Sequence, residues 1–193
     1  METLRENDWQ ARRGWSGLSP GYWAAALELQ EGRLVDSHRA LIEAPRGSEE
    51  RSSAFRRLHI DAHFLLISLR HVLRALEVCA QVLDDERVKA ISDDVAARAP
   101  WLKDFRDVLE HLDDYVRGEG RLHRDGKLPR GAGPFLAFDP LAPPFEVFVH
   151  LGPHRLPLRA AAGGGSRLGQ MLAEVWEQQF GPEKPHVVWG RGQ

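Results

Sequence analysis

The residues whose types and spacing best suit chemistry lie in one segment, Arg106-Asp107-Val108-Leu109-Glu110-His111. The segment falls within an apolar pattern at helical spacing, so Asp107 lies one turn before His111 and is able to hydrogen-bond the imidazole ring. This contact would hold the ring in place and favour its charged form. A simpler interpretation stays open, in which Arg106 with Glu110 and Asp107 with His111 are two ordinary surface pairs.

On a helix, Arg106 and His111 lie about 140° apart and flank the apolar stripe on opposite sides. Two side chains on opposite sides of one helix do not easily contact the same substrate atom. Two copies of the helix packed around a symmetry axis would bring each arginine beside the histidine of the other chain. The spacing therefore suits a site that a homodimer completes.

These residues resemble the signature of the HEPN superfamily, many of whose members are ribonucleases. The signature is an arginine followed by a polar residue, with a histidine after four intervening positions, on a late helix of a helical bundle. The resemblance covers the six motif residues and, loosely, the helices of residues 20–118. Some toxin members carry a tyrosine where this chain has Asp113, and Tyr115 lies two residues further on. This departure puts regulation by modification of that tyrosine in doubt.

The resemblance implies a metal-independent endoribonuclease, active as a homodimer, that serves as a toxin or a defence effector. Carried over, His111 would be the general acid or base, Arg106 would bind the phosphate or stabilise its developing charge, and Asp107 would be the polar orienting residue. The 2′-hydroxyl of RNA would attack the adjacent phosphate, and no metal or other cofactor would be needed. RNA would be the substrate, and a toxin would have an antitoxin as its partner.

Basic residues follow the motif with only Glu119 and Asp125 between them: Arg117, Arg121, Arg124, Lys127 and Arg130. We expect Arg117, Arg121, Arg124 and Lys127 to hold RNA phosphates beside the site, together with Arg70 from the long central helix. A solvated, flexible loop explains the same run of charges equally well.

A different class of function is suggested by His59 and His63, which are four residues apart on one helical face, a spacing that suits a metal ion. A third ligand would have to come from another helix, and His38 and His111 are the candidates. No cysteine cluster or HExxH pattern supports the site. The alternative is a polar seam lining a helix interface, made of His59, His63, Arg70, Arg74 and Glu77.

Two further features are interpreted as structural. Gly163-Gly164-Gly165 matches no phosphate-binding pattern and predicts a linker to a final helix that Ser166 caps. The single cysteine, Cys79, lies within an apolar helical pattern and predicts a buried, inert thiol.

The elements that position these residues are mostly helical. Start and stop signals predict helices over residues 20–44, 49–83, 84–99 and 101–117, with Gly32 as a point where the first helix is split. The second helix carries one apolar stripe of Leu58, Ala62, Leu65, Leu69, Val72, Leu76, Ala80 and Leu83, and a nearly opposite stripe of Ile60, Phe64, Ile67, Val78 and Val82. It must therefore be covered twice, as a central helix or as one face of a homodimer.

Alternating apolar residues from Phe145 to Leu151, a Gly152-Pro153 turn and a return over residues 155–160 predict a β-hairpin. The predicted fold is mainly α, a helical bundle with a C-terminal β-hairpin and helix. Its parts are an N-terminal arm (1–19), the bundle (20–118), a basic Gly- and Pro-rich loop (119–144), the hairpin with a helix packed on the bundle (145–182) and a tail (183–193).

Composition fits one globular domain. The 193 residues are 42% hydrophobic and 28% charged, which is ordinary for this class, and a formal net charge of −2 argues against a surface built to coat nucleic acid. No apolar run approaches the roughly 20 residues that span a bilayer, and the N-terminus lacks the apolar core of a signal peptide. We expect a cytoplasmic protein that does not enter the membrane.

Three functions remain as hypotheses. The first is a metal-independent endoribonuclease of HEPN type, with Arg106 and His111 of both chains forming the cleft. The second is a non-catalytic helical module that binds a protein or RNA. The third is a metal-binding helical bundle that uses His59 and His63.

Overall fold

The computed structural model describes residues 20–98, 117–129, 135–139 and 146–180, together with Trp101, Asp104, Phe105, Asp107, Val108, His111, Asp114 and Tyr115. The predicted N-terminal arm and tail lie outside these residues, as do Arg106, Glu110 and Arg130. Within the described residues the protein is mainly helical with a small antiparallel sheet, as the sequence predicts. None of the described helices is both long and apolar enough to cross a membrane.

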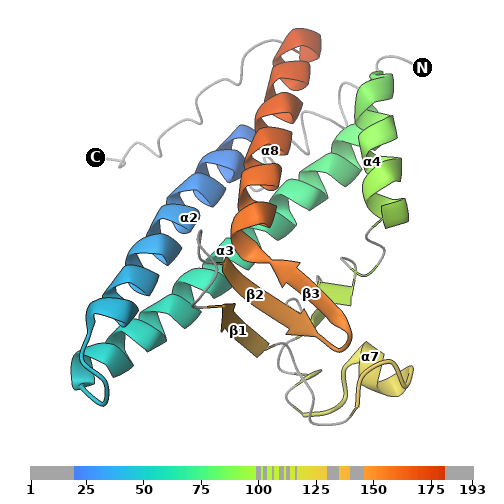
Figure 1. Ribbon diagram of the computed structural model, residues 1–193. Coiled ribbons are helices and arrows are strands. Elements are labelled where there is room, and N and C mark those ends of the chain that lie inside the picture. Colours follow the sequence, from blue (N-terminus) through green and yellow to red (C-terminus); the bar gives the residue numbers. More distant parts are fainter. Residues whose placement is uncertain are drawn as a thin grey trace, which may run out of the picture.

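Two long helices form the frame of the molecule (Figure 1). α2 (Pro20–Glu43) and α3 (Glu49–Val82) are joined by a tight turn in which Gly47 has a φ of 80°, a conformation that glycine adopts without steric cost. Ser48 caps α3 because its hydroxyl accepts a hydrogen bond from the Arg51 amide at 3.1 Å. Gly32 does not split α2, which runs unbroken through it.

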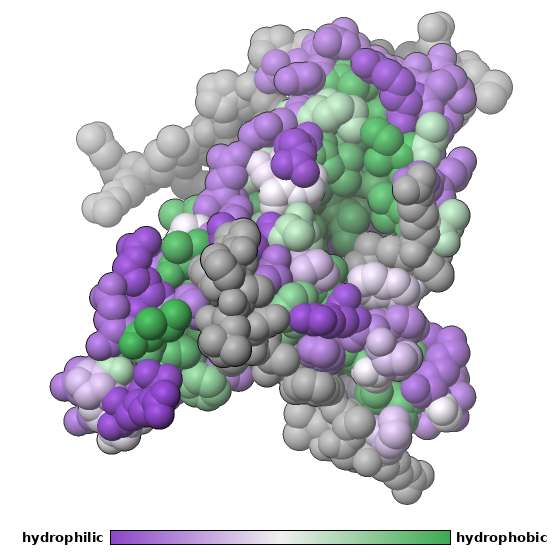
Figure 2. All heavy atoms as spheres, in the orientation of Figure 1, coloured by the Kyte–Doolittle hydropathy of each residue, from purple (hydrophilic) through white to green (hydrophobic). Residues whose placement is uncertain are grey.

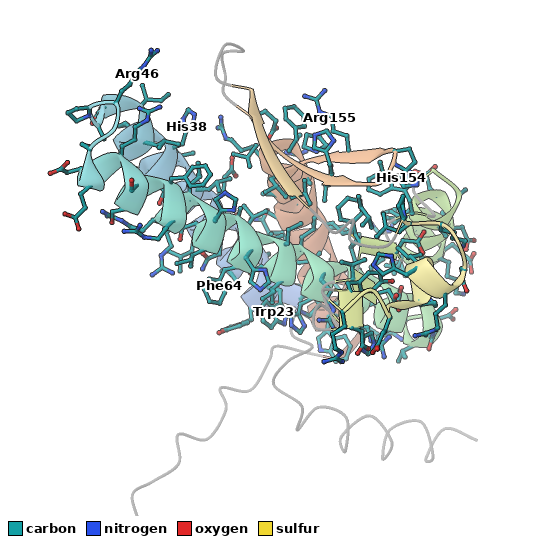
Figure 3. All side chains as sticks on the ribbon, turned by 90° about the horizontal axis from the view of Figure 1, so that it is seen from below. Trp23, His38, Arg46, Phe64, His154 and Arg155 are labelled. Carbon is teal, nitrogen blue, oxygen red and sulfur yellow. The ribbon has the colours of Figure 1, made fainter. Side chains whose placement is uncertain are left out.

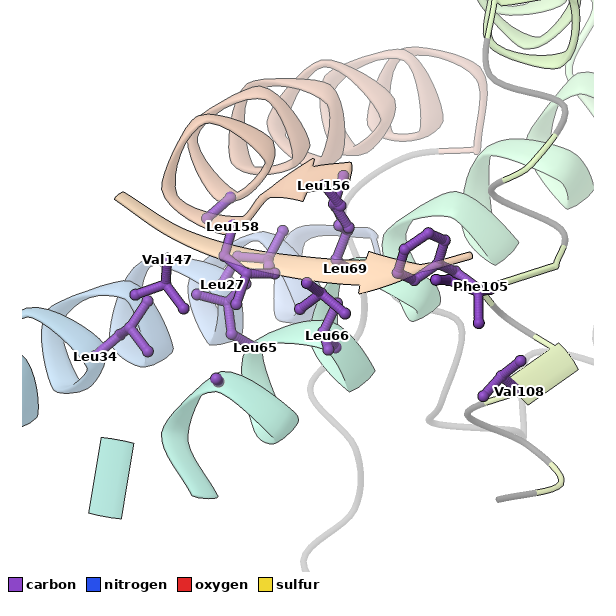
Figure 4. Packing of buried hydrophobic residues seen from close by; sticks show 14 of the residues in the cluster. Leu27, Leu34, Leu65, Leu66, Leu69, Phe105, Val108, Val147, Leu156 and Leu158 are labelled. Carbon is purple, nitrogen blue, oxygen red and sulfur yellow. The ribbon is translucent and has the colours of Figure 1, made fainter. Parts of the chain in front are cut away.

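α8 (Leu158–Phe180) lies across α2 and α3, and α4 (Glu86–Arg98) packs against the C-terminal half of α3 (Figure 1). One apolar cluster fills the space between α2, α3, α8 and the sheet (Figure 4). A second cluster joins α3, α4 and α8. The predicted inner stripe of α3 is confirmed, because seven of its members are buried: Leu58, Ala62, Leu65, Leu69, Val72, Leu76 and Leu83.

The opposite stripe of α3 is only partly covered. Ile60 is 53% exposed and Phe64 49% exposed, whereas Ile67, Val78 and Val82 are half-buried. A central helix covered on all sides by its own chain would bury all of them. Part of this apolar stripe is therefore exposed, and its cover by a second chain stays a prediction.

The predicted hairpin is present. β2 (Glu146–Leu151) and β3 (His154–Pro157) pair antiparallel, with Leu151 opposite His154. The two turn residues are Gly152, whose φ is 56°, and a proline, which suits the tight turns that connect twisted strands. Val147, Val149 and Leu151 are buried, which confirms the alternation.

The segment predicted as a loop, 119–144, contains two elements that the sequence did not indicate. α7 (Arg121–Arg124) is a single helical turn, and β1 (Phe135–Asp139) adds a third strand, so that the sheet has the order β1-β2-β3. β1 pairs with β2 from Phe135 opposite His150 to Asp139 opposite Glu146. Backbone pairing to β2 defines this strand, and five residues between prolines are too few to show an alternation.

α8 begins nine residues before Arg167, the first helical residue that a cap at Ser166 predicts. It starts at Leu158 and includes all three glycines, so the predicted linker is helix and the second strand ends at Pro157 instead of residue 160. The cap is Glu146 from β2, whose carboxylate accepts hydrogen bonds from the amides of Arg159 at 2.7 Å and Ala160 at 3.1 Å. A cap supplied by another strand satisfies the first amides of the helix and leaves no signal in the local sequence.

Glycines allow α8 to lie close to α2 and α3. A Cβ at Gly165 would stand 2.8 Å from methyl carbons of Leu27 and Leu69. A Cβ at Gly169 would stand 2.8 Å from the Cβ of Ala24 and 2.9 Å from the Pro20 carbonyl oxygen. The cost of glycine in a helix, about 1 kcal/mol relative to alanine, is therefore offset by close packing.

We predict that Gly169→Ala destabilises the protein by about 1–3 kcal/mol, because the new methyl group meets α2 backbone that does not move aside. The matched control is Gly164→Ala, where nothing lies within 4 Å of the new Cβ and the gain in helix propensity is about 0.5–1 kcal/mol. Urea unfolding followed by circular dichroism measures both. Equal effects of the two changes would contradict the proposed packing role.

Candidate functional site

The motif residues that the structure describes are Asp107 and His111. The predicted helix 101–117 does not run unbroken through them: Asp107 and Tyr115 are helical, but His111 lies at a turn with its side chain exposed. Arg106 lies outside the described residues, so the angle between Arg106 and His111 stays a prediction. His111 is open to solvent, and its amide donates to the Asp107 carbonyl at 3.1 Å.

The Asp107 carboxylate has partners other than the His111 ring. It accepts a hydrogen bond from the Tyr115 hydroxyl at 2.5 Å and lies 3.4 Å from Nε of Arg121. The Tyr115 oxygen in turn accepts a bond from the Leu122 amide at 3.1 Å. Among the described residues, the Asp107 carboxylate therefore ties the motif to α7 and does not hydrogen-bond the His111 ring.

Tyr115 is the centre of this contact, which we call the tyrosine clasp: Asp107, Tyr115, Arg121 and Leu122. Tyr115 is buried, and burial, followed by the hydrogen bond to Asp107, raises the pKa of its hydroxyl to about 12. A Cβ at Gly120 would stand 2.7 Å from the tyrosine ring, so the chain passes directly over it. These contacts give Tyr115 a structural role.

Most of the residues expected to hold RNA phosphates make contacts within the chain. Arg121 donates to Asp104 at 2.8 Å, Arg117 donates to Asp114 at 2.5 Å, and Arg124 hydrogen-bonds the Glu119 carbonyl. Lys127 is exposed. Arg70 lies half-buried on α3, beside His71. Three of the five charges thus stabilise the segment after the motif.

Among the described residues, the histidine pair proposed for a metal gains no third ligand. His59 is half-buried, with its ring 4.5 Å from that of Phe55, and His63 is exposed. Burial lowers the pKa of His59. Within the part of the chain that the structure describes, no three side chains of His, Cys, Asp or Glu are grouped so that they could hold a metal ion.

Cys79 is buried, and burial raises the pKa of its thiol to about 12. The thiol is therefore protonated at neutral pH and is a poor nucleophile. The predicted inert thiol is confirmed.

An exposed surface of mostly apolar and aromatic side chains extends over α2 and α3. Sequence patterns indicate only the part of it that lies on α3. Ile60, Phe64, Ile67 and His71 share one side of α3 at spacings of four, three and four residues. The ring of Trp23 stacks on that of His71 at 3.9 Å, and Tyr22 meets Trp23 edge-on at 5.2 Å. Figure 3 shows Trp23 and Phe64 on the same side of the helix pair. We call these side chains the aromatic face: Tyr22, Trp23, Ile60, Phe64, Ile67 and His71.

The centre of the aromatic face is apolar and uncharged at neutral pH. Tyr22 is 63% exposed, more than either Ile60 or Phe64. Burial, followed by the nearby charge of Arg70, lowers the pKa of His71, so its ring is neutral where it stacks. The outer stripe of α3 was visible in the sequence, but its continuation onto Tyr22 and Trp23 depends on how α2 packs and has no local signal.

A hollow of about 640 Å³ lies beside the turn between α2 and α3. Its described lining combines aliphatic, aromatic and basic side chains: His38, Leu41, Ile42, Gly47, Ser48, Arg51, Ser52, Phe55 and Arg56. We call it the hairpin pocket. Sequence patterns did not indicate it, because its lining comes from the ends of two helices.

Comparison with known proteins gives no relative for this chain. No family model matches it, no curated protein matches it and no solved structure matches it.

We predict that Tyr115→Phe lowers the free energy of unfolding by about 1–3 kcal/mol, because the Leu122 amide and the Asp107 carboxylate both lose a buried partner. Tyr22→Phe is the matched control at the only other tyrosine, and its exposed position predicts a change within about 0.5 kcal/mol. Urea unfolding measures both variants. If the two variants were equally stable, the tyrosine clasp would not contribute to stability. The Asp107 carboxylate would then be able to hydrogen-bond His111.

Proposed function

We propose that this protein is a non-catalytic helical interaction module that associates with a second copy of itself through the aromatic face. The observation that carries the proposal is the exposure of Tyr22, Ile60 and Phe64 at 63%, 53% and 49% on one side of α2 and α3. Fully burying such side chains contributes roughly 1.5–3 kcal/mol each. A grouped, exposed apolar surface of this kind is typical of an interface.

A second copy suits this face in length and charge. Ile60 to His71 extends about 16 Å along α3, enough for a helix-to-helix contact between two chains related by a two-fold axis. In an antiparallel pair centred between residues 66 and 67, Arg56 of one copy would lie across from Glu77 of the other. Arg56 makes no ion pair with the described residues, so this interchain contact would give it a carboxylate partner.

We predict that the wild-type protein is a dimer in analytical ultracentrifugation and that Phe64→Asp makes it a monomer, because a charge would be buried in the interface. The matched control is Phe55→Asp, on the same helix, nine residues earlier and half a revolution away, with a similar 44% exposure. It should leave the dimer intact. Circular dichroism checks that both variants keep their helices.

A monomeric wild-type protein at all concentrations would overturn the proposal. So would a dimer that persists in Phe64→Asp. Dissociation in Phe55→Asp but not in Phe64→Asp would move the interface to the hairpin pocket and would also overturn it.

A second candidate function is the HEPN-type endoribonuclease, with the roles of Arg106, His111 and Asp107 that the motif suggests. It is favoured by one observation, the exposed ring of His111 at a turn, where RNA is able to reach it. The engagement of Asp107 by Tyr115 and of Arg121 by Asp104 weighs against it, since both were expected to serve RNA. For this reason it stands second.

The two functions predict opposite outcomes when the protein is incubated with total RNA in EDTA. An interaction module leaves the RNA intact. A HEPN-type enzyme releases fragments with 2′,3′-cyclic phosphate ends, and His111→Ala or Arg106→Ala reduces the rate by roughly 100-fold or more. Arg57→Ala, which removes an exposed arginine outside both the motif and the set expected to hold RNA phosphates, is the control for general loss of positive charge.

A further inference from the structure

The hairpin pocket has the size and the chemistry of a binding site for a small organic anion. Its volume of about 640 Å³ lies within the range of pockets that bind small molecules. Figure 2 shows hydrophobic residues beside hydrophilic ones near the turn between α2 and α3, at the lower left of the molecule. In Figure 3, His38 lies at this end of the helix pair.

The apolar part of the pocket comes from both helices. Ile42 is 56% exposed and Phe55 is 44% exposed, and Leu41 lies half-buried beside them. These side chains line a concave surface instead of lying singly on a convex one. A ligand with an aliphatic or aromatic body would cover them and remove apolar area from water.

The charged part of the pocket is wholly basic among the described lining residues. Arg51 donates two hydrogen bonds from Nη1, to the Leu41 carbonyl at 2.8 Å and the Ala44 carbonyl at 3.2 Å. These bonds fix the guanidinium at the end of α2, and within the described part of the chain its Nε and Nη2 have no hydrogen-bond partner. Arg56 is exposed and forms no ion pair with described residues.

The remaining polar lining groups are neutral. Ser48 and Ser52 bring hydroxyl groups, and His38 is buried. Burial, followed by the nearby charge of Arg159, lowers the pKa of His38, so its imidazole carries no charge at neutral pH. A ligand anion would thus meet two arginines and no described carboxylate.

We propose that the hairpin pocket binds a small carboxylate with an apolar body. Arg51 and Arg56 hold the carboxylate, and Leu41, Ile42 and Phe55 hold the body. Arg51 is the better-positioned donor because its guanidinium is already fixed by two carbonyls, whereas Arg56 must be ordered when the ligand binds. This inference does not depend on the proposed dimer, because Arg51, Leu41, Ile42 and Phe55 are not part of the aromatic face. Arg56 lies one turn before Ile60 and is the one lining residue that the proposed dimer also uses.

The test uses decanoate as the probe, titrated into the full-length protein by isothermal calorimetry below its micelle-forming concentration. We expect saturable binding with one site per chain. Arg56→Gln should weaken it roughly fivefold or more, the effect of losing about 1 kcal/mol from one charge pair. Arg57→Gln is the matched control, an exposed arginine at the next position that does not line the pocket, and should bind as the wild type does.

Two further measurements separate charge from apolar contact. Decanol, with the same chain and no charge, should bind more weakly than decanoate, and Phe55→Asp should abolish decanoate binding while circular dichroism shows a folded protein. The proposal is overturned if decanoate gives no saturable heat, if Arg56→Gln and Arg57→Gln bind it equally, or if decanol binds as tightly. Binding of an aspartate-rich peptide at the pocket without any binding of decanoate would overturn it as well.

Discussion

The close approach of α8 to α2 and α3 is the constraint on which the rest of the structure depends. Both apolar clusters contain residues of α8, among them the fully buried Leu158 and Leu172. The helices come this near because Gly165 and Gly169 have no side chain at the contact. Beside it, the Glu28 carboxylate accepts hydrogen bonds from Ser166 at 2.6 Å and Gln170 at 2.8 Å. Interhelix spacing, not helix propensity, therefore determines which residues this helix can carry.

The sequence predicts those parts of the fold whose cause is local. α2, α3 and α4 have start signals, stop signals and apolar stripes in their own residues, and the hairpin has both an alternation and a turn. β1 and the true start of α8 have none of these, because a neighbouring strand supplies the backbone partners of β1 and Glu146 supplies the cap of α8. Gly163, Gly164 and Gly165 show the limit of such prediction. A flexible linker and a close contact between helices both favour glycine, so the sequence alone does not distinguish them.

The same distinction applies to the candidate sites. The motif around His111 was recognised from its spacing, yet the tyrosine clasp uses Asp107 and Arg121 in contacts that spacing does not reveal. Arg51 and Arg56 lie in the polar first turns of α3 and match no binding pattern in the sequence. They line a pocket only because the end of α2 packs beside them. The aromatic face lies between these cases, since α3 supplies half of it in a readable pattern and α2 supplies the rest through packing.

The hydrogen bond between Ser166 and Glu28 joins residues 138 positions apart, and this separation has a consequence for biosynthesis. When the α2–α3 hairpin leaves the ribosome, the surface that α8 will cover is still open to solvent, and about a hundred further residues must be made before it is closed. Leu27 and Leu69 are exposed on the nascent chain for all of that time. During this interval, chaperones or neighbouring nascent chains on the same message are able to bind the apolar groove before α8 covers it.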